Sequence, residues 1–275
     1  MMKNNTTCSN TVPKRILQIT DFHLFADSKG ELLGVNTAHA LEGVVKHIKK
    51  EVKNIDLILA TGDLSQDGTQ ESYQRAHQIL KILDTEIVYL PGNHDNLNHM
   101  KQALGPWLNP ITDLANWRVV SLNSMVAGSD EGYLAEEQFQ LLQKACTNTE
   151  QYVLLAVHHN PVPVGSTWLD PMMIANAHIL FHFCEKHPNI QAIIWGHVHQ
   201  SYESVYALDQ PRRHVHLLAT PATCIQFKPK SQSFALDDKQ PGYRIIELFP
   251  NGEIQTQVIR VNHLNIKPDH QSKGY

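Results

Sequence analysis

Residues 87–95 of the chain read IVYLPGNHD. The first four residues form a short apolar run, which predicts a buried strand. Gly92-Asn93-His94-Asp95 follows almost directly and supplies an amide oxygen, an imidazole and a carboxylate. Because α/β proteins gather functional groups beyond the carboxyl ends of their strands, this stretch predicts an α/β fold with a polar site at one end of a sheet.

Four further fragments have the same form, with polar donors after an apolar run. They are Asp21-Phe22-His23, Gly62-Asp63, His158-His159 and Gly196-His197-Val198-His199. Each pattern alone occurs often by chance, and isolated members of the 17 histidines carry little weight, but the ordered combination is specific. The five fragments together offer enough nitrogen and oxygen donors for two divalent cations.

Two of the fragments place donors two residues apart. In an extended backbone, positions i and i+2 project to the same side, so we expect Asp21 and His23 to reach one ion. His197 and His199 have the same spacing, and each could serve a different ion.

Asp63 is the natural bridge between two ions. It follows Gly62, a residue type that lets the backbone approach a crowded centre, and its two carboxylate oxygens can bind two cations. A shell of nitrogen and oxygen without thiolate favours Fe, Mn, Co or Zn over Ca or Mg. We expect two divalent metal ions, Fe and/or Mn, with Zn, Co or Mg as alternatives.

Strands and helices alternate along most of the chain. Apolar runs predict strands at residues 15–20, 57–61, 87–91, 117–123, 152–157 and 191–195. Helical spacing predicts helices at residues 37–52 and 69–83, capped by Thr37 and Thr69, and at residues 135–146 and 172–187. This alternation predicts a layered α/β core.

The rhythm changes after His199. Residues 214–220, 243–249 and 254–261 are expected to form strands with no helices between them. Asn251-Gly252 joins the last two, and Asn-Gly favours the positive backbone angles of a tight hairpin turn. We therefore expect an antiparallel pair.

Length and composition fit one soluble domain. The chain has 275 residues, of which 42% are hydrophobic and 18% charged, and the fragments span too much of it to be divided. We expect a single domain at residues 14–262 and polar, flexible termini at residues 1–13 and 263–275. The four cysteines form no C-x-x-C pair, and we expect them to be reduced thiols: Cys8, Cys146, Cys184 and Cys224.

Charge and hydropathy exclude several partners. A net charge of -4 argues against a general nucleic-acid surface. No window approaches the roughly 18 consecutive apolar residues of a membrane span, and residues 1–15 lack the apolar core of a signal peptide. We expect a cytoplasmic protein with no nucleic-acid or membrane partner, which is either a monomer or a homodimer.

The five fragments, in their order, resemble the signature of the calcineurin-like metallophosphoesterase superfamily. Four other segments are similar to the bacterial class III 3',5'-cyclic-AMP phosphodiesterases: LGVNT at 33–37, STWLD at 166–170, ATPATCIQFKP at 219–229 and PGYR at 241–244. The similarity extends from residue 16 to the terminal Gly274-Tyr275, so it covers nearly the whole chain.

The resemblance implies a role for each donor. The first ion would be held by Asp21, His23, Asp63 and His199, and the second by Asp63, Asn93, His158 and His197. His94 would be a catalytic imidazole that binds no metal, Asp95 would orient His94, and His159 would lie behind the ligands. The substrate phosphate would contact His23, Asp63, Asn93, His94, His158 and His199.

The same resemblance implies a four-layer αββα sandwich, in which two mixed β-sheets are flanked by helices. The reaction would be hydrolysis of 3',5'-cyclic AMP to 5'-AMP by a hydroxide that bridges the two metal ions. A metallophosphodiesterase of broader specificity, acting on 2',3'-cyclic nucleotides or glycerophosphodiesters, is the alternative, because the ligands name no base. A noncatalytic, metal-stabilised scaffold is a third reading, against which the complete ligand set and His94 count.

Substrate choice must come from the loops around the ions. Trp168, Phe227 and Lys228 are candidates for stacking on a base or meeting phosphate, although such residues more often pack or face solvent. The expected partner is a small molecule, cyclic AMP.

Overall fold

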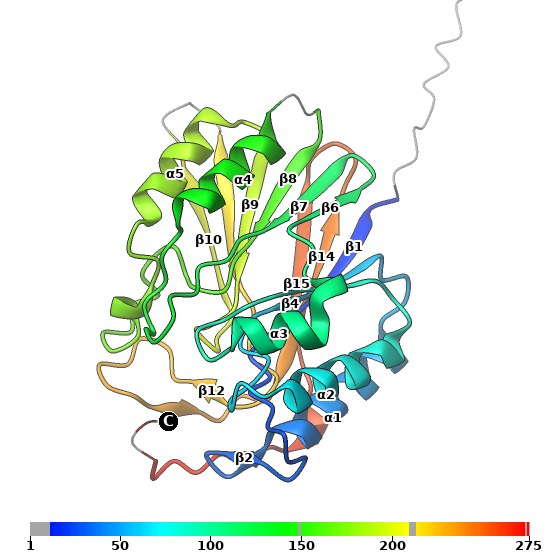
Figure 1. Ribbon diagram of the computed structural model, residues 1–275, viewed down its shortest axis with the longest axis vertical. Coiled ribbons are helices and arrows are strands. Elements are labelled where there is room, and N and C mark those ends of the chain that lie inside the picture. The colour runs from blue at the N-terminus through cyan, green and yellow to red at the C-terminus, as the bar shows by residue number, and fades with distance from the viewer. Residues whose placement is uncertain (1–11, 148–149, 209–212, 273, 275) are drawn as a thin grey trace, which may run out of the picture.

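Two β-sheets pack face to face in the computed structural model, and helices cover the outer face of each sheet (Figure 1). The structure describes residues 12–147, 150–208, 213–272 and 274. Cys8 therefore lies outside the described residues, as does most of the predicted N-terminal segment. None of the helices in the described part of the chain has the length and apolar character needed to cross a bilayer.

The first sheet has the strand order β15-β14-β1-β4-β5. β1 (Lys14–Ile19), β4 (Leu57–Thr61) and β5 (Ile87–Leu90) are parallel, while β14 (Gly242–Leu248) and β15 (Ile254–Arg260) are antiparallel additions. The helices of this half are α1 (Thr37–Glu51), α2 (Gln70–Leu80) and α3 (Leu97–Leu104).

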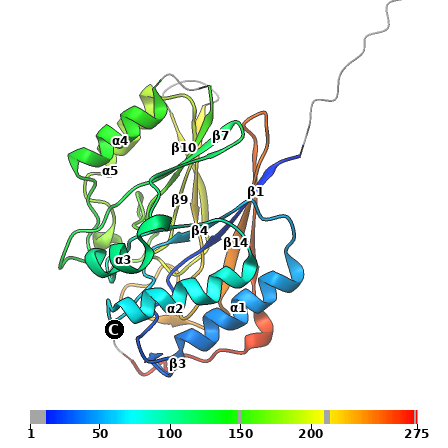
Figure 2. The ribbon, with the colours of Figure 1, turned by 45° about the vertical axis from the view of Figure 1, so that its right-hand side comes forward.

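The second sheet has the order β10-β11-β9-β8-β7-β6. Its strands are β6 (Ile111–Leu114), β7 (Trp117–Ser121), β8 (Tyr152–Ala156), β9 (Ile190–Trp195), β10 (Tyr202–Ala207) and β11 (His214–Ala219). Its helices, α4 (Glu136–Cys146) and α5 (Ala177–Lys186), lie on the side of the molecule opposite α1 and α2 (Figure 2).

Short elements complete the described chain. They are the ladders β2 (Glu31–Leu32) with β3 (Val35–Asn36) and β12 (Gln226–Phe227) with β13 (Leu236–Asp237), and the 3-10 turns Lys81–Leu83, Gly105–Trp107, Asp170–Met172 and Asn262–Leu264.

Three buried clusters separate four layers. One lies between the sheets and joins residues such as Leu59 and Ile194. A second packs α1, α2 and α3 on the first sheet, and a third packs α4 and α5 on the second. Because both faces of the central strands are covered, β4 is buried at every position. The predicted four-layer sandwich of two mixed sheets is confirmed.

The predicted strands are confirmed to within two residues at their ends, but three elements of four or more residues in the described chain were not predicted, nor were the short ladders and the 3-10 turns. Two of them, β6 and β10, are edge strands of the second sheet, and β10 alternates half-buried with exposed residues. The third, α3, has two buried residues, Met100 and Leu104, too few for a clear periodic pattern.

Three local predictions change in detail. The cap of α1 is Asn36 rather than Thr37, since the Asn36 side chain accepts from the amide of His39 at 2.8 Å. α5 begins at Ala177 rather than 172, because residues 170–172 form a separate 3-10 turn. β14 and β15 are antiparallel as predicted, but their loop is wider than a two-residue turn, and in it Gly252 has a positive φ (88°).

Candidate metal centre

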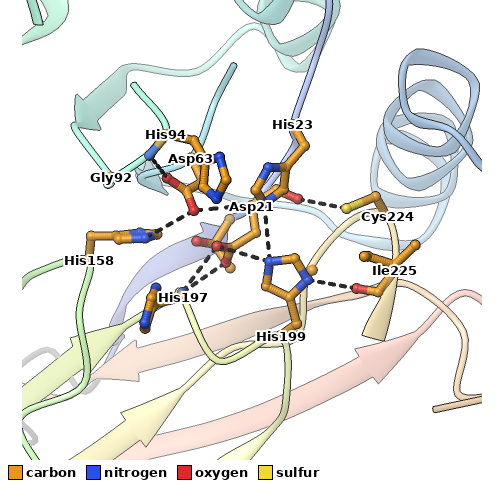
Figure 3. A network of polar contacts seen from close by, with 12 residues as sticks. Asp21, His23, Asp63, Gly92, His94, His158, His197, His199, Cys224 and Ile225 are labelled. Carbon is orange, nitrogen blue, oxygen red and sulfur yellow. Dashed lines mark hydrogen bonds and ion pairs between the residues drawn. The ribbon is translucent and has the colours of Figure 1, made fainter. Parts of the chain in front are cut away.

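The five fragments meet where the ends of both sheets come together (Figure 3). Three of them follow β1, β4 and β5 of the first sheet, and two follow β8 and β9 of the second. Backbone bonds join adjacent loops: Asp21 N–H donates to Gly62 O at 3.1 Å, and Gly196 N–H donates to His158 O at 3.1 Å. The topology thus gathers donors that are up to 178 positions apart in the sequence.

His23 and His199 face each other through their Nε2 atoms, which are 3.1 Å apart. Nδ1 of His23 lies 2.6 Å from the Gln66 side-chain oxygen, and Nδ1 of His199 lies 2.9 Å from Ile225 O. Because these oxygens can accept, Nδ1 of each ring has a hydrogen-bond partner on its outer side, and Nε2 is turned towards the other ring and the carboxylates; His199 Nε2 lies 3.4 Å from Oδ1 of Asp21. Burial lowers the pKa of His23 to about 3, which keeps this ring neutral.

A second set of donors surrounds Asn93. His158 donates from Nδ1 to Thr61 O at 2.9 Å, and its Nε2 lies 3.0 Å from Oδ1 of Asn93. Nδ1 of His197 lies 3.1 Å from the same oxygen. Burial lowers the pKa of His158, but the charge of Asp63 outweighs burial and raises the pKa to about 9. A positive charge is therefore favoured among these atoms.

Asp63 lies between the two sets. Its Oδ2 is 3.2 Å from Nε2 of His158 and 3.7 Å from Nε2 of His23. Burial raises the pKa of Asp63, but the neighbouring histidines, His158 first, hold it well below the usual range. The carboxylate is thus charged and placed to serve both sets, as a bridging ligand requires.

The donor set fits two cations. Buried ligand atoms of Asp21, His23 and His199 lie within 4.8 Å of one another, and so do those of Asp21, Asp63 and His158. Lone pairs that point at each other in a buried space are unfavourable unless a proton or a cation lies between them. The sequence-predicted carboxylate and imidazole donors are therefore brought together in overlapping groups: these two share Asp21, and a third joins Asp63 to His23 and His94.

Five of these side chains come from residues with a left-handed backbone conformation, which sets the direction of each side chain. Asp21, His23, Asp63, His197 and His199 have φ angles from 47° to 62°. The expectation that the D-x-H and H-x-H pairs are extended is therefore wrong. Asp21 and His23 nevertheless reach one group, and His197 and His199 point to different groups, because each turn reorients its side chain.

Two glycines make room for carboxylates. A Cβ on Gly92 would collide with the carboxylate and the backbone amide of Asp63, and a Cβ on Gly196 would collide with Thr20 and with the carboxylate of Asp21. The loops can approach the ligands this closely because these residues have no side chain.

Residues 219–229, which we call the strap, contact Asp21 and His199 through Cys224 and Ile225 (Figure 3). Ile225 O accepts from His199, the Cys224 thiol donates to Asp21 O at 3.2 Å, and the amide of Thr223 donates to Thr20 O at 3.2 Å. Burial raises the pKa of Cys224, so the thiol stays protonated. In the sequence, this segment indicated only the substrate class, and its contacts with Asp21 and His199 were not predicted.

The three residues considered for substrate contacts differ in exposure. Phe227 is 1% exposed and stacks on the His199 ring, with centroids 4.2 Å apart and planes 9° apart. Trp168 is half-buried and edge-on to Phe227, whereas Lys228 is exposed. Phe227 therefore has no face available for a base.

The remaining predicted residues lie around the two groups. His94 is half-buried, edge-on to His23 at 4.9 Å, and its amide donates to Asp63 at 2.9 Å. The Asp95 carboxylate accepts from the amides of Gly92, Leu64 and Ser65, and burial raises its pKa to about 7. It ties two loops together, while its expected action on His94 stays a prediction.

His159 lies against the second group. It is fully buried, its Nδ1 is 2.7 Å from the Ser124 hydroxyl, and its ring is edge-on to His158 at 4.9 Å. One of its ring nitrogens also lies within 4.8 Å of ring nitrogens of His158 and His197, so its expected place outside the metal ligands stays a prediction.

Two mixed sheets with paired Asp/His groups at their shared end define a phosphoesterase of the dinuclear type. The chain belongs to the calcineurin-like phosphoesterase family, whose sequence model matches residues 14–201.

Relatives of known name match along the whole chain. A Pseudomonas aeruginosa protein named 3',5'-cyclic adenosine monophosphate phosphodiesterase CpdA is 39% identical, over 100% of this chain and 100% of its own. The Haemophilus influenzae protein of the same name is 41% identical over 95% of each chain.

Solved structures of low identity share the fold. A dimetal phosphatase from Danio rerio is 15% identical, with a TM-score of 0.60 over 92% of this chain and 100% of that one. A purple acid phosphatase from yellow lupin, also 15% identical, has a TM-score of 0.63 and covers 92% of this chain and 52% of that one. Similarity at this level concerns the fold alone.

Proposed function

We propose that the chain hydrolyses 3',5'-cyclic AMP to 5'-AMP at a dinuclear metal centre. The observation that carries this proposal is the pair of buried donor groups that share Asp63. Full-length relatives named as cyclic-AMP phosphodiesterases support the choice of substrate.

Seven residues would hold the metal ions. Asp21, His23, Asp63 and His199 serve the first ion, and Asp63, Asn93, His158 and His197 the second. Two divalent cations held by these residues would lower the pKa of a bound water and withdraw charge from the substrate phosphate. The nitrogen-rich shell favours Fe and/or Mn, with Zn, Co or Mg as alternatives.

Hydrogen bonds orient the imidazole ligands before any ion arrives. Thr61 O and Ile225 O lie 2.9 Å from Nδ1 of His158 and His199, and these contacts turn both Nε2 atoms towards the donor groups. Gln66 does the same for His23.

His94 is the proposed acid. Its amide is fixed by Asp63, and its half-buried ring lies beside His23, with a ring nitrogen within 4.8 Å of ligand atoms of His23 and Asp63. From there the imidazole stabilises the phosphate charge and gives a proton to the departing 3' oxygen, which leaves 5'-AMP. His23, Asp63, Asn93, His158 and His199 would also line the phosphate site.

The test is a rate comparison on metal-reconstituted protein. The His94→Ala variant should lose about 10²- to 10⁴-fold in kcat/KM for cyclic AMP and keep both ions, since general acid catalysis is worth that much. His178→Ala, at an exposed position of α5, is the matched control and should be unchanged. Full activity in His94→Ala would contradict the role of this residue.

A substrate panel tests the specificity. Rates on 3',5'-cyclic AMP, 2',3'-cyclic AMP and a glycerophosphodiester should favour the first. Equal kcat/KM on all three would replace the proposal with a general phosphodiesterase.

A further inference from the structure

The ring of His199 is held on two sides. Its Nδ1 donates to Ile225 O at 2.9 Å, and the face of Phe227 lies parallel to it at 4.2 Å. Both contacts come from the strap, and the His199 and Phe227 side chains are almost completely buried.

The two contacts restrict different motions. The hydrogen bond to Ile225 sets which nitrogen faces the donor group, but the imidazole can still rock about the Nδ1–H···O line. A parallel ring in van der Waals contact blocks that out-of-plane motion on one side. The direction of the Nε2 lone pair is thus defined by the carbonyl and the aromatic face together.

Phe227 is itself held firmly. Trp168 lies edge-on to it, with centroids 5.0 Å apart and planes at 80°, and Phe234 contacts it in the same way at 5.8 Å. Its backbone belongs to β12, where it pairs with Leu236 of β13. A ring fixed at both its backbone and its edges can transmit its position to His199.

We infer that Phe227 is a positioning residue for the first metal ion, acting through the ring plane of His199. This inference rests on the dinuclear centre of the proposed function but not on cyclic AMP as substrate. A leucine at this position would fill part of the volume and leave the imidazole free to tilt. Groups that support metal ligands from outside typically change metal affinity about 10- to 100-fold when removed.

The experiment is a calorimetric titration of metal-stripped protein with Mn²⁺, without substrate. Phe227→Leu should weaken one of the two binding constants at least about tenfold and leave the other within about twofold. Phe181→Leu makes the same change at another buried ring, which stacks on Tyr206 of β10, and should leave both constants within about twofold.

Two results would overturn the inference. The first is that Phe227→Leu leaves both Mn²⁺ binding constants unchanged. The second is that both binding constants are weakened equally in both variants, which would indicate a general loss of packing. If Phe227→Leu does not fold, Phe227→Met, which preserves more volume, takes its place. It should likewise weaken one binding constant and leave the other unchanged. A chain that binds two ions but does not cleave cyclic AMP would refute the proposed substrate and leave this inference intact.

Discussion

The Nε2 atoms of His23 and His199 lie 3.1 Å apart, while Nδ1 of each ring already has an oxygen partner. Two ring nitrogens this close together are unfavourable unless a proton or a cation lies between them. A cation between them would convert that contact into two bonds. A bound cation should therefore stabilise the folded chain.

Metal removal should lower the melting temperature. At a free Mn²⁺ concentration about 100 times Kd, each bound ion should add about 2.7 kcal/mol to the free energy of unfolding. For a chain of this length, each kcal/mol corresponds to about 2 to 4 °C. Calorimetry of EDTA-stripped and Mn²⁺-loaded protein measures the shift. The Asp63→Ala variant, which lacks the shared ligand, should show a much smaller one.

Gly92→Ala should disrupt the centre although Gly92 is not itself a proposed ligand. The new Cβ would collide with the Asp63 carboxylate, and a displacement of about 1 Å in a catalytic site can cost about 100-fold in rate. We expect a loss of this size in kcat/KM together with reduced metal content. Gly105→Ala is the control, since no atom lies within 4 Å of its Cβ position. Normal metal content in Gly92→Ala would argue against the close packing of these loops.

Arg244→Met should weaken the contact between the two sheets. Arg244 extends from β14, is completely buried, and donates to Ala219 O at 2.7 Å and Tyr202 O at 3.3 Å in the opposite sheet. The variant leaves buried carbonyls without a donor, so urea unfolding should show a loss of about 1 to 3 kcal/mol. Lys239→Met, which removes an exposed ion pair with Asp237, should change stability by less than about 1 kcal/mol.

Acid should destabilise the metal-free protein partly through His159. Burial lowers the pKa of this ring to about 3 from an ordinary 6.5. The unfolded chain therefore binds a proton that the folded chain does not, and stability falls as the pH decreases from 6.5 towards 3. Between pH 7.5 and 5.5, His159→Asn should lose less unfolding free energy than the unchanged protein. Identical losses would show that His159 is not held neutral.

Donor types at strand ends were enough to predict that these side chains meet, because carboxylates and imidazoles differ chemically from their neighbours, while the assignment of each to an ion came from family resemblance. Their orientation was not predictable. It depends on Thr61 O and Ile225 O, and backbone carbonyls are the same for every residue type, so they leave no mark in a sequence. Phe227 shows the same limit, since a sequence reveals an aromatic ring but not what its face contacts.

The strands of the fold were predictable where burial leaves a pattern in the sequence. Continuous apolar runs indicated strands such as β4, because that strand is buried on both faces. The half-exposed edge strand β10 and the short helix α3 bury too few side chains to give a clear period. The division into two sheets came from family resemblance, because strand pairing is a long-range property.

The left-handed turns at Asp21, His23, Asp63, His197 and His199 set a limit on engineering this chain. Such conformations cost about 1 to 3 kcal/mol each in residues other than glycine, and folding elsewhere has to offset that cost. Selection for heat resistance alone would tend to relax these turns and scatter the donors, a trade-off of stability against activity. A more robust variant should therefore be sought in the sheets and outer helices, with these five positions kept unchanged.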